Sequence, residues 1–77
     1  MAKYVVYVNA PPYPMRGYYL EARRLSIPEA RGERDFRDTL PPDLVHVCGT
    51  AWVEVEATNV EEAKAIGLSK IMKCEEK

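Results

Sequence analysis

Hydrophobic and polar residues alternate along the chain between positions 44 and 57. One face of this stretch would carry Val45, Val47, Ala51, Val53, Val55 and Ala57, and the other would carry His46, Cys48, Thr50, Trp52, Glu54 and Glu56. A repeat of two residues is typical of a strand with one covered face. The pattern therefore predicts a long strand, or two short strands that join at Cys48 and Gly49.

Two earlier segments predict further strands. Residues 3–9 are rich in β-branched and aromatic residues and end just before a cluster of prolines. Residues 17–27 fit a helical face and strand alternation equally well, because the run is too short for its period to decide. We favour a strand for this segment, since a preceding strand and a proline-rich turn suggest a hairpin.

The stretch from Ala10 to Pro14 holds three prolines, which cannot pair inside a sheet. It predicts a stiff, extended connector, in which Tyr13 is an aromatic residue that a partner protein could contact.

Residues 59–73 predict an amphipathic helix. Thr58 or Asn59 can cap its first turn, and Glu61 or Glu62 stands at the matching position of a capping box. The expected apolar stripe consists of Val60, Ala63, Gly67, Ile71 and Cys74, flanked by Ile66 and Leu68. A glycine in the middle of this stripe indicates a close approach between the helix and a sheet.

Between these elements, residues 28–43 are punctuated by Pro and Gly and crowded with charge, which predicts a long loop with one helical turn starting at Pro28. Together the elements predict one α+β domain over residues 1–77: a three-stranded antiparallel sheet with one C-terminal helix packed on one face. The valine face should meet the helix, which leaves the face of Trp52 without a helix to cover it.

The run from Val53 to Ala63, Val-Glu-Val-Glu-Ala-Thr-Asn-Val-Glu-Glu-Ala, resembles a strand-into-helix unit of ferredoxin-like and HicB-type antitoxin domains. This resemblance covers about a seventh of the chain. It implies a small α+β fold and no particular activity or site residue.

The composition is that of an ordinary globular protein, with 77 residues and a formal charge of −1. No apolar run approaches the ~20 residues needed to span a bilayer, and the N-terminus does not resemble a signal peptide. We therefore expect a cytoplasmic protein with reduced cysteines. The lack of Gln beside many Glu, Lys and Arg is a thermophilic tendency.

Two pairs of residues could carry chemistry. His46 and Cys48 would point the same way from one strand, as metal ligands or as a thiol with its base, and Glu54 and Glu56 could act as paired carboxylates. Neither pair has a supporting motif, so we expect a non-enzymatic protein with no catalytic residue, cofactor or metal. Cys48 and Cys74 should lie on opposite sides of the sheet as two free thiols.

The large aromatic side chain of Trp52 would be covered either by the 28–43 loop or by another chain. This leads to our main hypothesis, a small protein-interaction module that self-associates through an uncovered sheet face or edge, with itself or another protein as its partner. The expected contact residues are Trp52, Tyr13 and Phe36.

Charge is distributed unevenly, and this supports an alternative hypothesis. Residues 1–37 hold seven basic and four acidic residues, whereas residues 38–77 hold four basic and eight acidic ones. Arginine binds phosphate and tyrosine stacks on bases, so segment 13–37 could bind RNA or single-stranded DNA. Its candidate residues are Arg16, Tyr18, Tyr19, Arg23, Arg24, Arg31, Arg34 and Arg37.

Overall fold

The computed structural model describes residues 1–10, 17–47 and 49–72. Its elements in chain order are β1 (Ala2–Asn9), β2 (Tyr19–Arg24), α1 (Ile27–Ala30), the short 3-10 helix η1 (Arg37–Thr39), β3 (Trp52–Ala57) and α2 (Val60–Met72). Four sequence predictions lie outside the described residues: the Pro11–Pro14 connector with Tyr13, Arg16, Cys48 and Cys74.

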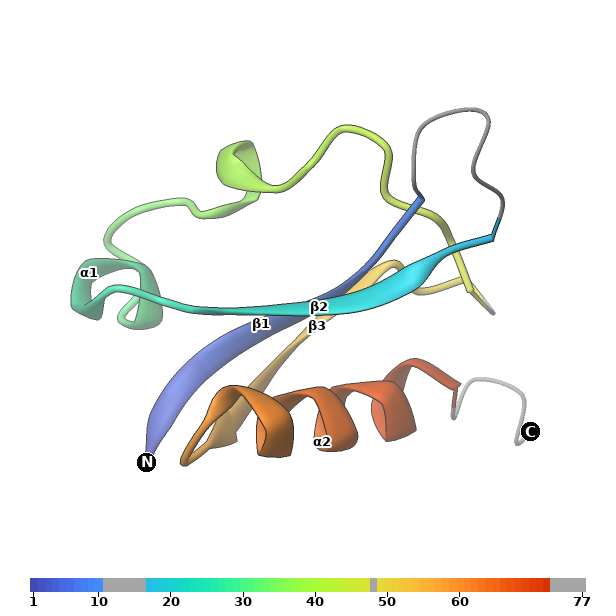
Figure 1. Cartoon of the computed structure of the whole chain (residues 1–77). Coiled ribbons are helices and arrows are strands. Elements are labelled where there is room, and N and C mark those ends of the chain that lie inside the picture. The colour runs from blue at the N-terminus through green and yellow to red at the C-terminus, as the bar shows by residue number, and fades with distance from the viewer. Residues whose placement is uncertain (11–16, 48, 73–77) are drawn as a thin grey trace.

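The strands form an antiparallel sheet in the order β2-β1-β3, with β1 in the centre (Figure 1). The second segment is therefore a strand, as the hairpin argument predicted. The α+β fold with a C-terminal helix on a three-stranded sheet is also confirmed. Because only three strands pair, both β2 and β3 are edge strands.

Helix α2 covers one face of the sheet, below it in Figure 1. This face holds a core of Tyr4, Val6, Val55, Ala57 and Ala63, all buried. The valine face of β3 thus meets the helix, as predicted.

Gly67 explains how closely the helix approaches. A Cβ atom added at Gly67 would lie 2.5 Å from Val6 Cβ, and Val6 is fully buried in the central strand. Real Cβ atoms do not come so close to another carbon, so the absence of a side chain at this position sets the distance between α2 and β1.

The first turn of α2 settles the capping alternatives. Asn59 Oδ1 accepts a hydrogen bond from the Glu62 backbone N–H at 2.7 Å, so Asn59 is the capping residue. The Glu62 carboxylate in turn accepts from the backbone N–H and the hydroxyl of Thr58, at 2.7 and 2.9 Å. These bonds lower the pKa of Glu62, the backbone bond most.

Two predictions were too regular. The alternating stretch pairs as a continuous strand only over Trp52–Ala57; residues before it form isolated bridges, Asn9 with Leu44 and Val47 with Thr50. In α2, Ala63, Gly67 and Ile71 are buried as expected, but Val60 and Leu68 are 41% and 45% exposed. Val60 is the first residue of the helix, and Leu68 lies to one side of the line formed by Ala63, Gly67 and Ile71, so both stand at the margin of the contact with the sheet.

Candidate interaction surfaces

The face of the sheet opposite α2 is covered by the chain itself. Phe36 is 6% exposed and meets Trp52 edge to face, with ring centroids 5.3 Å apart and planes at 87°. Both rings belong to a second core cluster with Val5 and Leu25. The expectation of an uncovered face at Trp52 is therefore wrong, because residues 25–40 fold back over it (Figure 1). Of the two alternatives for Trp52, the loop supplies the cover.

This covering segment begins with a capped helical turn. The Ser26 hydroxyl accepts from the Glu29 backbone N–H at 3.4 Å, and the Glu29 carboxylate accepts from the Ser26 backbone N–H at 2.9 Å. Pro28 stands in the first turn, where its missing N–H is not needed. The single turn predicted at Pro28 is thus confirmed as α1.

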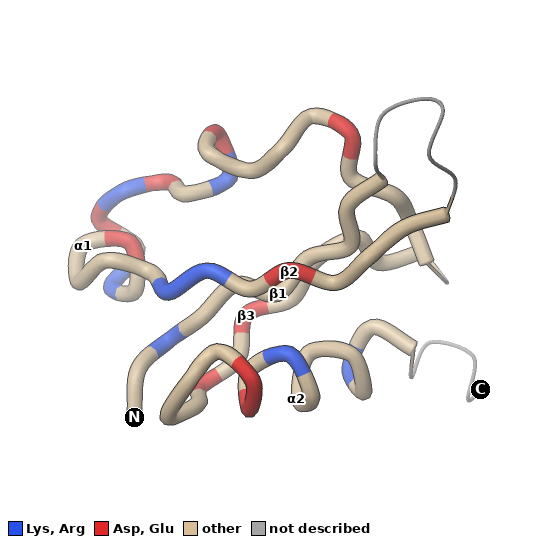
Figure 2. The backbone as a smooth tube through the Cα atoms, in the orientation of Figure 1, with Lys and Arg blue, Asp and Glu red and all other residues tan. Residues whose placement is uncertain are grey.

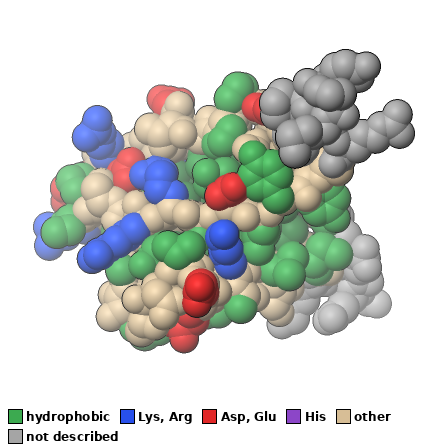
Figure 3. Space-filling model, viewed as in Figure 1, with side chains coloured by type: hydrophobic (Ala, Val, Ile, Leu, Met, Phe, Trp, Pro, Cys, Tyr) green, Lys and Arg blue, Asp and Glu red, His purple; other side chains and the backbone are tan. Residues whose placement is uncertain are grey.

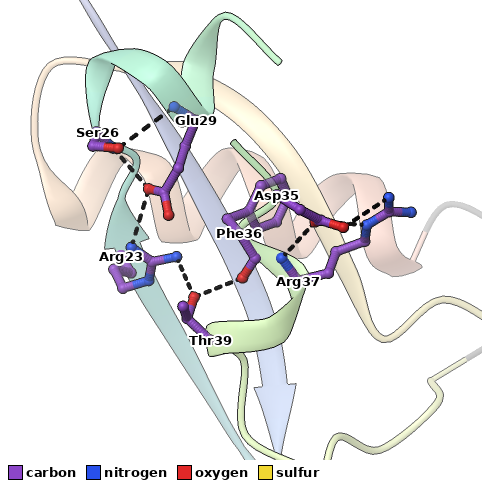
Figure 4. A network of polar contacts seen from close by, with 7 residues as sticks. All are labelled: Arg23, Ser26, Glu29, Asp35, Phe36, Arg37 and Thr39. Carbon is purple, nitrogen blue, oxygen red and sulfur yellow. Dashed lines mark hydrogen bonds and ion pairs between the residues drawn. The ribbon is translucent and has the colours of Figure 1, made fainter. Parts of the chain in front are cut away.

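Arg23 connects β2 to both ends of the covering segment (Figure 4). Its Nη2 donates to the Thr39 hydroxyl at 2.8 Å, and its Nη1 lies 3.5 Å from Glu29 Oε1. The Thr39 hydroxyl donates onward to the Phe36 carbonyl oxygen at 2.6 Å. Arg23 therefore helps to hold Phe36 against the sheet.

The carboxylates of the segment are also bound within the chain. Asp35 accepts from Arg37 Nε at 3.0 Å and from the Arg37 backbone N–H at 2.9 Å, and the side-chain bond most lowers the pKa of Asp35. The Ser26 backbone N–H is the main cause of the lowered pKa of Glu29, against the smaller effect of burial. These pairs join residues of the covering segment to one another and so stabilise its conformation.

A groove of about 540 Å³ runs between the covering segment and β3. Phe36 and Trp52 line it together with charged side chains of both signs. The charged residues that line it are Glu29, Arg31, Glu33, Arg34, Asp35, Arg37 and Glu54. Three arginines against four carboxylates give no preference for an anion or a cation, and Figure 2 shows the two signs alternating along this segment.

The arginine and tyrosine candidates do not form one surface. Arg23 and Arg37 are bound to Glu29 and Asp35, as described above. Tyr18 precedes β2 and Tyr19 begins it, whereas Arg24 ends the strand and Arg31 and Arg34 follow it in the chain. Arg24, Arg31 and Arg34 are exposed, and their side chains make no hydrogen bond or ion pair to another described residue. Nucleic-acid binding by this segment stays a prediction, and Arg16 lies outside the described residues.

Of the other described candidate residues, Glu54 lines this groove, whereas Glu56 and His46 do not. Glu54 and Glu56 are exposed, and Glu54 lies 3.9 Å from Lys3 Nζ. His46 is exposed. Within residues 1–10, 17–47 and 49–72, no group of three His, Cys, Asp or Glu side chains is placed to hold a metal ion.

The two sheet edges are the surfaces that sequence reasoning left least defined. Leu25 N–H donates to the Lys3 carbonyl and Val8 N–H donates to the Ala51 carbonyl, both at 2.9 Å. In an antiparallel ladder, alternate residues of the central strand bond to opposite neighbours. Even-numbered residues of β2 and of β3 therefore point their backbone groups outward. These residues are Leu20, Ala22 and Arg24 on β2, and Trp52, Glu54 and Glu56 on β3.

The side chains make these two edges different. On the face opposite α2, β2 carries Glu21 and Arg23, one residue of each sign, opposite Tyr7 and Val5 of β1. The same face of β3 carries only acidic residues after Trp52, namely Glu54 and Glu56. Figure 3 views the molecule from the β2 side, where both signs of charge and hydrophobic side chains are exposed. The order of these charged residues can be read from the sequence, but only the strand pairing shows that they lie along open edges of the sheet.

No family model matches this chain, and neither the curated proteins nor the solved structures contain a detectable relative. In the part of the chain that is described, no helix has the length and apolar character needed to cross a membrane.

Proposed function

We propose that this protein is a non-enzymatic interaction module that self-associates by adding a strand to the open edge of β2. The observation that carries the proposal is the row of outward backbone groups at Leu20, Ala22 and Arg24, which bond to no other described residue. An edge of this kind is a template for another strand. Main-chain hydrogen bonds supply the affinity in such contacts, and side chains select the partner.

The contrast with β3 supports the choice of edge. If β3 paired with its own copy about Val55, Glu54 would face Glu56 of the partner strand on the same side of the sheet. Like charges directly opposite each other are destabilising. Self-pairing of β3 about Val55 is therefore disfavoured, whereas β2 carries one residue of each sign and has a register that opposes unlike charges.

Measurement of mass against concentration, by sedimentation or light scattering, tests the proposal. We expect the mass to rise above that of one chain for the wild type. Ala22→Pro should abolish the rise, because proline removes the outward N–H and adds a ring at the edge. Glu54→Pro makes the same change on the outer edge of β3 and should leave association intact.

Hydrogen exchange on the wild type is a second test, and it needs no variant to fold. The amides of Leu20, Ala22 and Arg24 should gain protection as concentration rises, while those of Glu54 and Glu56 should not. A single-chain mass at every concentration would overturn the proposal. Salt-sensitive amide shifts at Arg24, Arg31 and Arg34 on addition of single-stranded RNA, without self-association, would favour the nucleic-acid alternative instead.

A further inference from the structure

We infer that the partner strand is β2 of a second copy, paired antiparallel with Ala22 opposite Ala22. This inference rests on the proposed function and adds the register that makes it specific. Two antiparallel strands related by a two-fold axis through the sheet are centred on one residue, since residues opposite each other point to the same face. Each possible centre in β2 therefore gives a different set of opposed side chains.

Only one centre within β2 pairs its charges well. Centred on Ala22, Glu21 of each strand lies opposite Arg23 of the other, which gives two cross-strand pairs of opposite charge. A centre on Glu21 places two carboxylates face to face, and a centre on Arg23 does the same with two guanidinium groups. A centre on Leu20 leaves Arg23 outside the ladder, because β2 begins at Tyr19.

The backbone agrees with this register. Ala22 has outward N–H and C=O groups, so the two Ala22 residues form a hydrogen-bonded pair, and Leu20 pairs in the same way with Arg24 of the other copy. The ladder then contains about six hydrogen bonds. Glu21 and Arg23 fall at the intervening non-hydrogen-bonded pairs, where opposing Cα atoms are only about 4.5 Å apart.

The contacts inside each copy also suit this arrangement. Glu21 and Arg23 lie on the same side of β2 as Tyr7 of β1, and the Glu21 carboxylate adds to the rise in the Tyr7 pKa that burial mainly causes. The Arg23 guanidinium is already held in place by Thr39 and Glu29. An arginine fixed in this way loses less conformational entropy when a carboxylate arrives opposite it.

The assembly would be closed. The two sheets join as β3-β1-β2-β2-β1-β3, so six strands form one sheet with both α2 helices on the same face. Its outer edges are the two β3 strands, which carry the acidic side chains of Glu54 and Glu56, and charged side chains on an edge strand disfavour further pairing. A dimer rather than a filament follows from this order.

Disulfide trapping can determine which residues of the two β2 strands lie opposite each other. In a background with both native cysteines replaced by serine, Ala22→Cys should form a disulfide-linked dimer under mild oxidation, because hydrogen-bonded pairs place Cα atoms about 5.5 Å apart. Glu21→Cys, the matched control on the same strand, should form none on its own. Trapping by Glu21→Cys and not by Ala22→Cys would overturn the register.

A charge reversal tests the cross-strand pairs. Glu21→Lys places a cation opposite Arg23 twice and should weaken dimerisation about ten-fold or more. Glu56→Lys makes the same change in net charge on β3 and should not weaken it. If the wild type dimerises and Ala22→Pro prevents this, but Glu21→Lys has no effect, the register fails while the proposed function stands. A wild type that stays monomeric overturns both.

Discussion

The two faces of the sheet are covered in different ways. One face is covered by α2, a regular helix whose buried positions recur along one stripe and whose Gly67 lies against Val6. The other is covered by residues 25–40, which contain only one helical turn and one 3-10 turn. That cover depends on Phe36 as its buried aromatic residue and on a few polar bonds from Arg23, Thr39 and Glu29. The contacts that hold helix α2 on the sheet are spread along the helix, whereas those that hold residues 25–40 depend on a few side chains.

Removal of the Phe36 ring should have the largest effect on this comparison. Phe36→Ala is expected to cost about 3–5 kcal/mol of unfolding free energy, because the ring is buried against Trp52 and Val5. Urea denaturation at low temperature measures the loss. Amide exchange should rise first in residues 26–40 and later in α2. Equal loosening of both covers would contradict the idea that Phe36 holds one of them.

Addition of a methyl group at Gly67 tests the helical cover. Gly67→Ala should destabilise the protein by about 1–3 kcal/mol, because the new Cβ overlaps Val6 in the core. Helix propensity alone predicts the opposite, a gain of about 1 kcal/mol. Ser69→Ala, on the exposed side of the same helix, is the control and should be neutral or slightly stabilising. A Gly67→Ala variant more stable than the wild type would show that α2 can move away from the sheet at little cost.

The smallest expected effect is a dependence of stability on pH that arises in the covering segment, residues 25–40. The pKa of Glu29 is below its ordinary value of 4.5, mainly through the Ser26 backbone N–H. Its stabilising contribution is therefore present above pH 4.5 and is lost as the pH falls through the lower, folded pKa. Glu29→Gln should be less stable than the wild type at pH 7, and the two should converge in acid.

Thermal denaturation of Glu29→Gln and of the wild type, measured from pH 7 down into acid, shows whether their stabilities converge. Glu33→Gln is the matched control, because the Glu33 side chain is exposed and bonds to no described residue. If the difference in stability between Glu29→Gln and the wild type stays constant with pH, the charge of the Glu29 carboxylate does not stabilise the covering segment.

Local sequence determined the regular elements and little else about the surface. The alternation at Val53 and Val55, the cap at Asn59 and the glycine in the stripe each act within a few residues, so the sheet, the helix and their contact followed from pattern. The position of residues 25–40 did not follow. Phe36 and Trp52 lie far apart in the chain, and their contact depends on where an aperiodic segment crosses the sheet.

The interaction surface was decided by tertiary structure for the same reason. The sequence suggested Trp52, and folding buried much of that residue under Phe36. The sequence also contains Glu21, Ala22 and Arg23. These residues are available to a second strand only because β1 pairs with both neighbours and leaves β2 at an edge of the sheet. Hydrophobic period is a property of consecutive residues, whereas an open edge is a property of which strands meet, and that is set by contacts between distant parts of the chain.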